Sequence, residues 1–537
     1  MSSLKIAIAQ INFLVGNIAA NVQHIIESAH YARDELGADL IVFPELTITG
    51  YPAEDLLLRK DFITAANNAL YSLAEQVSGI AIVVGYPELS GDELYNSAVV
   101  LHQGVILANY RKQALPNYGV FDEQRYFAEG SQPCVFEFNG TFIGLTICED
   151  VWQGGIIEQT KQAGAELLLT LNASPFNAGK IHQREAVICQ QIKAAQIPLV
   201  YVNQIGGQDE LIFDGASFVT DAQGEIIFRA VEFAEQISVI EFHDGQPVPN
   251  HCIAQQEEIP SIYQALVLGV KDYVRKNGFS GAILGLSGGI DSALVLVLAV
   301  DALGADKVEV VLMPSRYTQD MSNEDAVLQA DTMGVKYHII PIEPAVTAFT
   351  GMLADVFAGT KKDTTEENIQ ARCRGVILMA LSNKQGRLLL TTGNKSEMSV
   401  GYATLYGDMA GGFAPIKDAP KLLVYALSVY RNSLSPVIPE RVITRPPSAE
   451  LAPDQVDADS LPPYEILDPI LERYVEQDEA AEDIIAAGFK REDVERAIRL
   501  VDRNEYKRRQ SPPCIRITGR AFGRDRRYPI TSGYKGI

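Results

Sequence analysis

The segment that most restricts the fold is GAILGLSGGIDSALVLVLAV, residues 281–300, where a short apolar run passes through two glycines into a long apolar stretch. This pattern predicts a buried strand, a tight turn and the start of a buried helix. At such a turn, backbone N–H groups at the helix N-terminus can bind pyrophosphate. The segment lacks the GxxxxGK[ST] pattern, and the chain contains no GxGxxG, so neither a Walker site nor a dinucleotide fingerprint applies.

Length and composition limit the class of protein. With 537 residues the chain is too long for one hydrophobic core, and 47% hydrophobic with 21% charged residues is ordinary for a globular protein. A net charge of -23 argues against binding nucleic acid or an anionic membrane. No apolar run reaches about 18 residues, so no membrane span is expected. The N-terminal MSSLKIAIAQINF is typical of a first strand, not of a signal peptide.

The six cysteines are scattered, without CxxC pairs or metal-ligand spacing, which favours a reduced, cytoplasmic protein. They are Cys134, Cys148, Cys189, Cys252, Cys373 and Cys514.

The first 240 or so residues alternate short β-branched runs with amphipathic stretches, which predicts an α/β sandwich. The expected strands are 5–11, 40–43, 80–85, 97–101, 141–147, 166–171, 199–203 and 215–219, with helices at 21–36 and 184–195.

A polar, proline-punctuated stretch at 241–260 indicates a linker. We expect a first domain at 1–245, a linker at 246–260 and a second domain at 261–537. The second domain opens with an amphipathic helix at 261–277, for which Gly278 is a C-terminal cap. Residues 435–463, rich in Pro, Asp and Ser, are expected to form a long surface loop.

A basic stretch near the C-terminus is either a solvated face or tail, or part of the binding site for an anionic substrate. It comprises Lys507, Arg508, Arg509, Arg516, Arg520, Arg524, Arg526 and Arg527.

Three reactive residue types lie at the ends of expected strands, where α/β folds place their chemistry. They are Glu45 in IVFPELTITGYP, Lys112 in ANYRKQALPNYGVF and Cys148 in GLTICEDVW. A cysteine alone is more often a core residue, but unpaired charges such as Glu45 and Lys112 are rarely buried without a reason. Lys112 would favour the thiolate and stabilise an oxyanion, while Glu45 would accept the thiol proton and later activate water.

Together these motifs, over residues 3–240, resemble the nitrilase superfamily with its Glu-Lys-Cys triad. The resemblance implies an αββα sandwich, a thioester intermediate and release of ammonia from an amide. In the glutaminase members of this superfamily, Tyr118 and the LNASPFNAGK segment match substrate-binding positions, which implicates Ser174 and Lys180. Glu149 would hold the substrate ammonium. For these four, ordinary turn and surface residues are the alternative.

SGGIDS, residues 287–292, resembles the loop of the N-type ATP pyrophosphatases, which cleave ATP between its α- and β-phosphates and form an adenylated intermediate. The resemblance implies a Rossmann-like parallel sheet of the adenine nucleotide alpha hydrolase type. It also implies Mg²⁺ at Asp291. Several families share this loop, among them GMP, asparagine and argininosuccinate synthetases and tRNA-modifying enzymes, so the loop alone leaves the substrate open.

Sequence blocks downstream of SGGIDS narrow the choice of substrate. ENIQARCRGVILMALSN, TTGNKSEMSVGYATLYGDMAGGF and PPSAELAPDQVDADSLPPY resemble the glutamine-dependent NAD+ synthetase family, in which a nitrilase-type domain precedes the synthetase domain. The resemblance implies ATP contacts at Gly285, Leu286, Ser287, Gly288, Gly289, Ile290, Asp291, Ser292, Thr392 and Lys421. It implies contacts with deamido-NAD+ at Asn368, Glu397, Tyr402, Thr404, Asp408 and Lys507, and Mg²⁺ at Asp291 and Glu397.

The resemblance thus implies ATP-dependent amidation of deamido-NAD+ with ammonia from glutamine, in a homo-oligomer formed through the synthetase domain. Because ammonia is mostly protonated at neutral pH, an enclosed passage from Cys148 to the adenylate is expected. Two alternatives stay open. One is an ATP-pyrophosphatase amidotransferase with another acceptor, and the other is a free-standing amidase with a non-catalytic C-terminal module.

Overall fold

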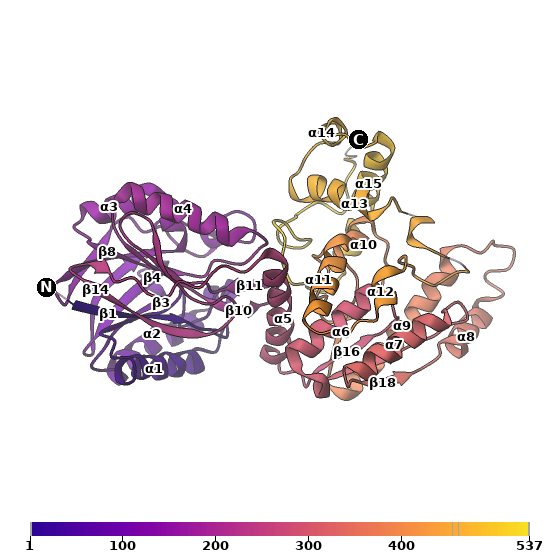
Figure 1. The fold of residues 1–537 in the computed structure, drawn as a ribbon, viewed down its shortest axis with the longest axis horizontal. Helices are drawn as coiled ribbons and strands as arrows, with labels where there is room; N and C mark the ends of the chain where they lie inside the picture. The colour runs from indigo at the N-terminus through magenta and orange to yellow at the C-terminus, as the bar shows by residue number, and fades with distance from the viewer. Residues whose placement is uncertain (1–2, 454, 460, 535–537) are drawn as a thin grey trace. The chain divides into compact units, whose positions relative to one another are not determined.

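The computed structural model describes residues 3–453, 455–459 and 461–534, which fold into two compact units, 1–257 and 258–537 (Figure 1). The first unit is built on a seven-stranded sheet, in the order β15-β14-β1-β2-β3-β4-β5, and a six-stranded sheet, in the order β13-β12-β9-β8-β7-β6. Parallel pairing joins β1, β2 and β3 in one sheet and β7, β8 and β9 in the other. Antiparallel strands flank both groups.

The strands of the first unit are β1 Ser3–Gln10, β2 Leu40–Val42, β3 Ala81–Ser90, β4 Glu93–His102, β5 Val105–Arg111, β6 Cys134–Phe138, β7 Thr141–Ile147, β8 Leu167–Asn172, β9 Leu199–Asn203, β10 Ile205–Gln208, β11 Leu211–Asp214, β12 Phe218–Thr220, β13 Ile226–Arg229, β14 Gln236–His243 and β15 Gln246–Pro247. Its helices are α1 Ile18–Asp34, α2 Lys60–Gln76, α3 Gly154–Gln162 and α4 Lys180–Ala195.

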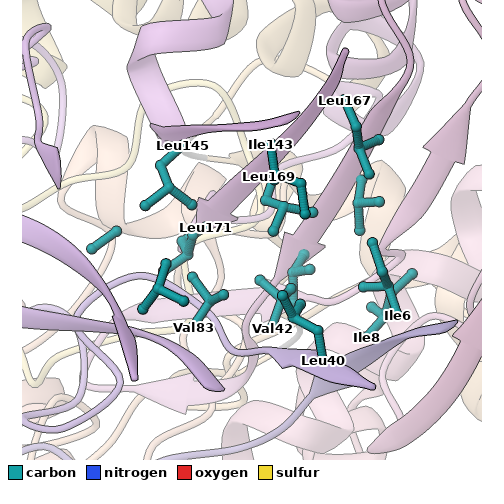
Figure 2. Close-up of a cluster of buried hydrophobic side chains, with 14 of the residues drawn as sticks. Ile6, Ile8, Leu40, Val42, Val83, Ile143, Leu145, Leu167, Leu169 and Leu171 are labelled. Atoms are coloured by element: carbon teal, nitrogen blue, oxygen red, sulfur yellow. The ribbon is translucent and has the colours of Figure 1, made fainter. Parts of the chain in front are cut away.

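The core of the first unit lies between its two sheets, because successive residues of a strand point to opposite faces. Ile6, Ile8 and Val42 from one sheet meet Leu145 and Leu169 from the other in this layer (Figure 2). Helices α1 and α2 cover the outer face of the first sheet, and α3 and α4 cover that of the second. The expected αββα sandwich is therefore confirmed.

Two details of the first unit differ from the sequence-based expectations. The strand expected at 215–219 begins only at Phe218, because Gly215 has a φ of 68°. The stretch expected as a linker, 246–260, largely belongs to the first unit. Its β15 pairs with β14, and the Asn250 side chain donates to the Val239 carbonyl. Helix α5 then begins at Glu258, three residues earlier than expected.

The second unit is built around a parallel sheet in the order β18-β17-β16-β19. Its strands are β16 Ala282–Gly285, β17 Val308–Leu312, β18 Lys336–Ile339 and β19 Leu388–Leu390. Its helices are α5 Glu258–Lys276, α6 Ile290–Leu303, α7 Asp320–Thr332, α8 Glu343–Leu353, α9 Thr364–Gln385, α10 Lys395–Val400, α11 Lys421–Leu434, α12 Glu440–Thr444, α13 Tyr464–Leu471, α14 Ala481–Ala486, α15 Arg491–Arg503 and α16 Glu505–Arg508.

Helix α6 explains the long apolar run after the glycines, since it packs against α5 and α11 as well as on β16 and β17. Its residues from Ala293 to Ala299 are all buried. Helices α13 and α15 form a second apolar cluster with Val400 at the end of α10. No helix of the described residues is both long and apolar enough to cross a membrane.

Candidate active sites

Cys148 follows β7 directly and starts a short 3-10 turn, Cys148–Trp152. Its φ of 45° lies in the left-handed region, which a non-glycine residue keeps only where its surroundings hold it. The Asp150 carboxylate supplies that hold, because it accepts the N–H of Ile147 at 2.8 Å and that of Ala114 at 2.8 Å. Through these two bonds, Asp150 attaches the turn that bears the Cys148 thiol to the segment that follows Lys112.

Lys112 lies between two carboxylates in the interior of the first unit. Its Nζ is 2.7 Å from Glu45 Oε1 and 2.8 Å from Glu123 Oε2, and the side chains of Lys112 and Glu45 are fully buried. Burial alone would lower the pKa of Lys112, but Glu123 and Glu45 hold it well above its usual value. Lys112 is therefore a permanent cation, and its loss would leave two buried carboxylates without a counter-charge.

Glu123 is the residue at this site that the sequence did not reveal. Burial raises its pKa to about 7, an effect that Glu45 adds to and Lys112 opposes. Tyr51 donates to Glu123 Oε1 at 3.1 Å. Because Asp122 stands next to Glu123 in the sequence, only the fold shows which of the two acids points inward.

The surroundings of Cys148 favour its protonated thiol. Burial raises its pKa well above the usual value, Glu45 raises it further, and Lys112 lowers it. Lys112 thus acts in the expected direction, toward the thiolate, but burial and the carboxylates outweigh this one cation. Glu45, whose charge acts on the thiol, can take the thiol proton as the sulfur attacks. Asn96 and the backbone N–H of Ala173 orient Glu45, with bonds of 2.7 and 3.2 Å.

The four residues matched to glutamine binding lie around this centre. The Tyr118 hydroxyl donates to Glu149 Oε2 at 3.0 Å, and the Lys180 ammonium lies 5.9 Å from the ring centre of Phe121, which contacts Tyr118. Ser174 is buried one residue beyond the Ala173 N–H that binds Glu45. The structure thus brings Tyr118 and Glu149 into contact, and it buries Ser174 more deeply than Tyr118.

A buried chain of polar groups behind Ser174 was also not visible in the sequence. The Arg184 guanidinium makes two bonds of 3.0 Å to Asp214, and Asn203 donates to the same carboxylate at 3.1 Å. Asn203 in turn accepts the Ser174 N–H at 2.9 Å. These contacts fix the backbone at the end of β8, from which Ser174 and the Ala173 N–H extend.

In the second unit, the SGGIDS loop leaves the end of β16 and enters α6 at Ile290. The Ser287 hydroxyl accepts the Gly289 N–H at 3.1 Å, and the Ser292 hydroxyl donates to the Gly289 carbonyl at 2.9 Å. Gly288 has a φ of 82°, and a Cβ there would lie 2.2 Å from the Ser322 carbonyl oxygen. Gly288 therefore cannot be replaced without moving α7, whereas Gly289 is in an ordinary extended conformation.

The loop borders a cavity of about 550 Å³, which is large enough for a nucleotide. Twelve of the positions matched to ATP or dinucleotide contacts line it: Gly285, Leu286, Ser287, Gly289, Ile290, Asp291, Ser292, Thr392, Glu397, Tyr402, Asp408 and Lys421. Gly288, Asn368, Thr404 and Lys507 are not among the lining residues.

Asp291, Glu397 and Lys421 form a second lysine–carboxylate centre. Lys421 Nζ lies 2.5 Å from Asp291 Oδ2 and 3.3 Å from Glu397 Oε1. Burial raises the pKa of Glu397 to about 8, with Lys421 opposing and Asp291 adding to the shift. Asn394 donates to Asp291 Oδ1 at 2.8 Å. Lys421 is therefore the counter-charge shared by these two carboxylates.

The remaining residues matched to the dinucleotide support the loop at 401–408. Asn368 accepts the Thr404 hydroxyl at 2.7 Å, and Asp408 accepts the Thr404 N–H at 2.7 Å. The Lys507 ammonium donates to the carbonyls of Gly401 and Ala403 at 2.7 and 2.8 Å. The loop is thus held by Asn368, Thr404 and Lys507, none of which is a lining residue of the cavity. Asp408 does line the cavity, and burial raises its pKa to about 6.

The segment 435–463 was expected to be a surface loop, and the structure corrects this. It contains α12, and residues 445–451 and 455–457 form a wall of the cavity. The Arg445 guanidinium donates to the Gly288 carbonyl and, at 3.0 Å, to the Ser322 hydroxyl. Ser322 also donates to Glu450 at 2.6 Å. Inward-facing side chains, which composition does not reveal, attach this segment to the phosphate loop.

The C-terminal basic stretch is neither a solvated tail nor a lining of the cavity. Arg508 and Arg526 are buried against Glu505, and Arg516 pairs with Asp525. The same region braces the TTGNKSE motif, because buried Lys395 donates to Thr518 at 2.7 Å and to Glu476 at 2.6 Å. Asp418 accepts the backbone N–H groups of residues 517 and 518. Most of these charged side chains therefore form ion pairs or hydrogen bonds within the second unit.

The fold and the two centres define a class: a nitrilase-like domain joined to an α/β domain with a parallel sheet and a cavity large enough for a nucleotide. Residues 5–245 match the carbon-nitrogen hydrolase family, and residues 262–511 match the NAD synthase family.

Glutamine-dependent NAD(+) synthetases from two organisms align over almost the whole chain. That of Acinetobacter baylyi is 52% identical over 100% of this chain and 99% of the relative. That of Aquifex aeolicus is 42% identical over 99% and 100%. A solved structure of the glutamine-dependent NAD+ synthetase from Acinetobacter baumannii, in complex with ADP, is 49% identical and covers 98% of each chain, with a TM-score of 0.81. The chain belongs to the glutamine-dependent NAD(+) synthetase family.

Proposed function

We propose that this chain transfers the amide nitrogen of glutamine to the nicotinate carboxylate of deamido-NAD+, with ATP converted to AMP and pyrophosphate. The observation that supports this most directly is the presence of two separate lysine–carboxylate centres. One has a buried thiol, and the other borders a cavity of about 550 Å³ beside the SGGIDS loop. The first suits cleavage of a small neutral amide, and the second suits a large polyanion.

In the first centre, the Cys148 sulfur attacks the glutamine amide carbon as Glu45 takes the thiol proton. Lys112 stabilises the tetrahedral oxyanion. The C–N bond then breaks, Glu45 returns the proton to the departing nitrogen, and ammonia leaves a thioester. A water molecule, deprotonated by Glu45, attacks the thioester and releases glutamate with the thiol restored. Tyr118, Glu149, Ser174 and Lys180 hold the glutamine.

In the second centre, a nicotinate carboxylate oxygen attacks the α-phosphorus of ATP, and pyrophosphate leaves toward the N–H groups of the SGGIDS loop. Ammonia then attacks the acyl-adenylate carbon, AMP departs, and the amine loses a proton to give NAD+. Asp408, with a pKa of about 6, is positioned at the cavity to accept that proton.

The donor set of the second centre fits Mg²⁺, which prefers carboxylate oxygens together with substrate phosphates. Asp291 and Glu397 would hold it. No group of three or more metal-binding side chains gathers in the described part of the chain. When bound, Mg²⁺ would offset negative charge on the phosphates.

The test is one incubation with deamido-NAD+, Mg-ATP and glutamine labelled with ¹⁵N at the amide, read by mass spectrometry. Labelled NAD+ with an equal amount of AMP is the expected result. Release of glutamate without AMP or NAD+ would contradict the proposed acceptor, and full-rate amide hydrolysis independent of ATP would favour an amidase. Adding unlabelled ammonium also tests retention of ammonia: the label in NAD+ should not be diluted.

A further inference from the structure

A second, much smaller cavity adjoins the nucleotide-sized cavity of the second unit. Its volume of about 20 Å³ is enough for one water-sized molecule, and ammonia is of that size. The two cavities share four lining residues: Thr391, Gly393, Glu397 and Asp408. The small cavity therefore meets the large one at Asp408, the carboxylate proposed to accept a proton from the amine.

Much of the remaining wall of the small cavity is apolar. Met398, Ala403, Met409 and Ala414 line it, and none of them lines the large cavity. An ammonium ion would lose its hydration shell in such a space at a high cost, whereas neutral ammonia has no net charge to desolvate. Only the neutral form can attack the acyl-adenylate, because the nitrogen of ammonium has no free electron pair.

Among the described residues that line the small cavity, Lys417 is the one cation. It is 4% exposed, and its ammonium donates to the Pro512 carbonyl and, at 3.2 Å, to the Ser511 hydroxyl. No carboxylate within residues 3–453, 455–459 and 461–534 forms an ion pair with it. The positive charge of Lys417 is therefore not offset by a bonded anion, unlike that of Lys421.

The backbone around Lys417 is held on both sides. Ala414 pairs with Cys514, and the Lys417 N–H donates to the Ala414 carbonyl at 3.2 Å. The next residue, Asp418, accepts the two backbone N–H groups of 517–518. The ammonium group of Lys417 is therefore fixed at the cavity wall by the attachment of this segment to the C-terminal region.

The large cavity by itself attracts cations, because five carboxylates are among its lining residues. They are Asp291, Glu397, Asp408, Glu450 and Asp457. This negative charge draws in ammonium more strongly than ammonia. A fixed positive charge in the wall of the small cavity has the opposite effect, since it repels any cation there and leaves a neutral molecule unaffected.

We propose that the small cavity receives the nitrogen nucleophile as neutral ammonia, and that Lys417 excludes ammonium and other monovalent cations from it. This assignment rests on the proposed function and adds a specificity-determining residue to it. Lys417 forms no bond in the reaction and takes no proton. Its charge selects which form of the nucleophile stands beside Asp408.

The test uses rubidium, a monovalent cation close to ammonium in size that cannot release a proton. Initial rates of NAD+ synthesis from subsaturating ammonium are measured at one pH, while rubidium chloride replaces choline chloride at constant ionic strength. The wild-type rate should stay unchanged. Lys417→Met, which removes the charge, should be inhibited in competition with ammonium. Its inhibition constant for rubidium should be at least about tenfold below that of the wild type, because a nearby unit charge in a protein interior changes cation binding by at least this factor.

Three further variants separate the charge of Lys417 from its hydrogen bonds. Lys417→Gln keeps a side-chain donor but no charge, and it should be as sensitive to rubidium as Lys417→Met. Ser511→Ala removes one hydrogen bond of Lys417 and keeps the charge, so it should stay insensitive. Lys384→Gln, an exposed site on α9, is the charge-matched control and should also stay insensitive.

Three results would overturn the role of Lys417. They are equal sensitivity to rubidium in the wild type and the uncharged variants, insensitivity of both uncharged variants, and loss of all synthesis in both. The last result would show that Lys417 is needed for the structure of the site and not for selection of ammonia. A wild type that makes no NAD+ from ammonium or from glutamine would instead refute the proposed function.

Discussion

Each candidate active site places a lysine between two carboxylates, yet the two centres differ in their surroundings. In the first, the side chains of Lys112, Glu45 and Glu123 are 0%, 0% and 6% exposed. In the second, Lys421 is 1% exposed, but Asp291 and Glu397 are each 17% exposed and border the cavity.

Protein donors surround the carboxylates of the closed centre. Asn96, the Ala173 N–H and Tyr51 bind the oxygens of Glu45 and Glu123 in addition to Lys112. At the open centre, part of each carboxylate stays accessible. We propose that the same charge arrangement serves proton transfer where the carboxylates are sealed, and binding of a polyanion with its metal where they are open.

The largest expected effects come from removing the reactive group of each centre. Cys148→Ala should lower glutamine-dependent synthesis by at least about 10³-fold, because no other group can form the thioester. Asp291→Asn should lower synthesis about 100-fold with either nitrogen source, because a charged group is lost at the phosphates. NAD+ formation from glutamine and from ammonium, with glutamate release, measures both.

The two variants should fail in opposite assays if the centres are chemically separate. Cys148→Ala should keep synthesis from ammonium, and Asp291→Asn should keep glutamate release. Loss of synthesis from ammonium in Cys148→Ala would show that the closed centre also takes part in adenylation, and would contradict the separation.

The next effect is on stability. Lys112→Met should destabilise the first unit by about 3–5 kcal/mol, because it leaves two buried carboxylates unpaired. Lys421→Met should cost less, since its carboxylates are partly exposed to water. The chain has one tryptophan, Trp152, in the turn that follows Cys148, so its fluorescence during urea unfolding reports the first unit. That signal should shift in Lys112→Met and stay unchanged in Lys421→Met.

A smaller effect concerns pH. The pKa of Glu123 is about 7 in the folded protein, against an ordinary value of 4.5. Between these values the folded protein keeps a proton that the unfolded chain has released, so raising the pH removes stability. Relative to Glu123→Gln, the wild type should therefore lose stability as the pH rises from about 4.5 to 7. Urea unfolding followed through Trp152 over this range measures the difference, and a constant difference would contradict it.

The smallest effect is expected at the exposed rim of the closed centre. Tyr118 is 59% exposed and donates to Glu149. Tyr118→Phe should raise the KM for glutamine by about two- to tenfold, as expected for loss of one hydrogen bond that water can partly replace. Tyr31→Phe, an exposed tyrosine on α1, is the matched control. An unchanged KM in Tyr118→Phe would remove Tyr118 from the glutamine site.

The sequence predicted the residues that carry local signatures. Expected strand ends marked Glu45 and Cys148, the family motif marked Lys112, and the SGGIDS pattern marked the start of α6. Residues whose role depends on contacts between distant segments were missed. Asp214 and Arg184 meet across 30 positions, and nothing in either local stretch indicates the pair.

Composition also failed where polar side chains point inward. The Pro- and Asp-rich segment 435–463 has the composition of a solvent-exposed loop. Its Arg445 and Glu450 side chains nevertheless bind residues beside the cavity. Composition also predicted a linker at 246–260, and residues 246–257 of this stretch, although polar, bind the first unit.

The bracing of the TTGNKSE motif by the C-terminal region has a genetic consequence. Residues 517 and 518 bind Asp418, and Thr518 binds Lys395, two positions before Glu397. A premature stop codon shortly before residue 517 would therefore spare every residue of both centres and still disable the second. Nonsense alleles that truncate only this last stretch should behave as null for synthesis while the shortened product continues to hydrolyse glutamine.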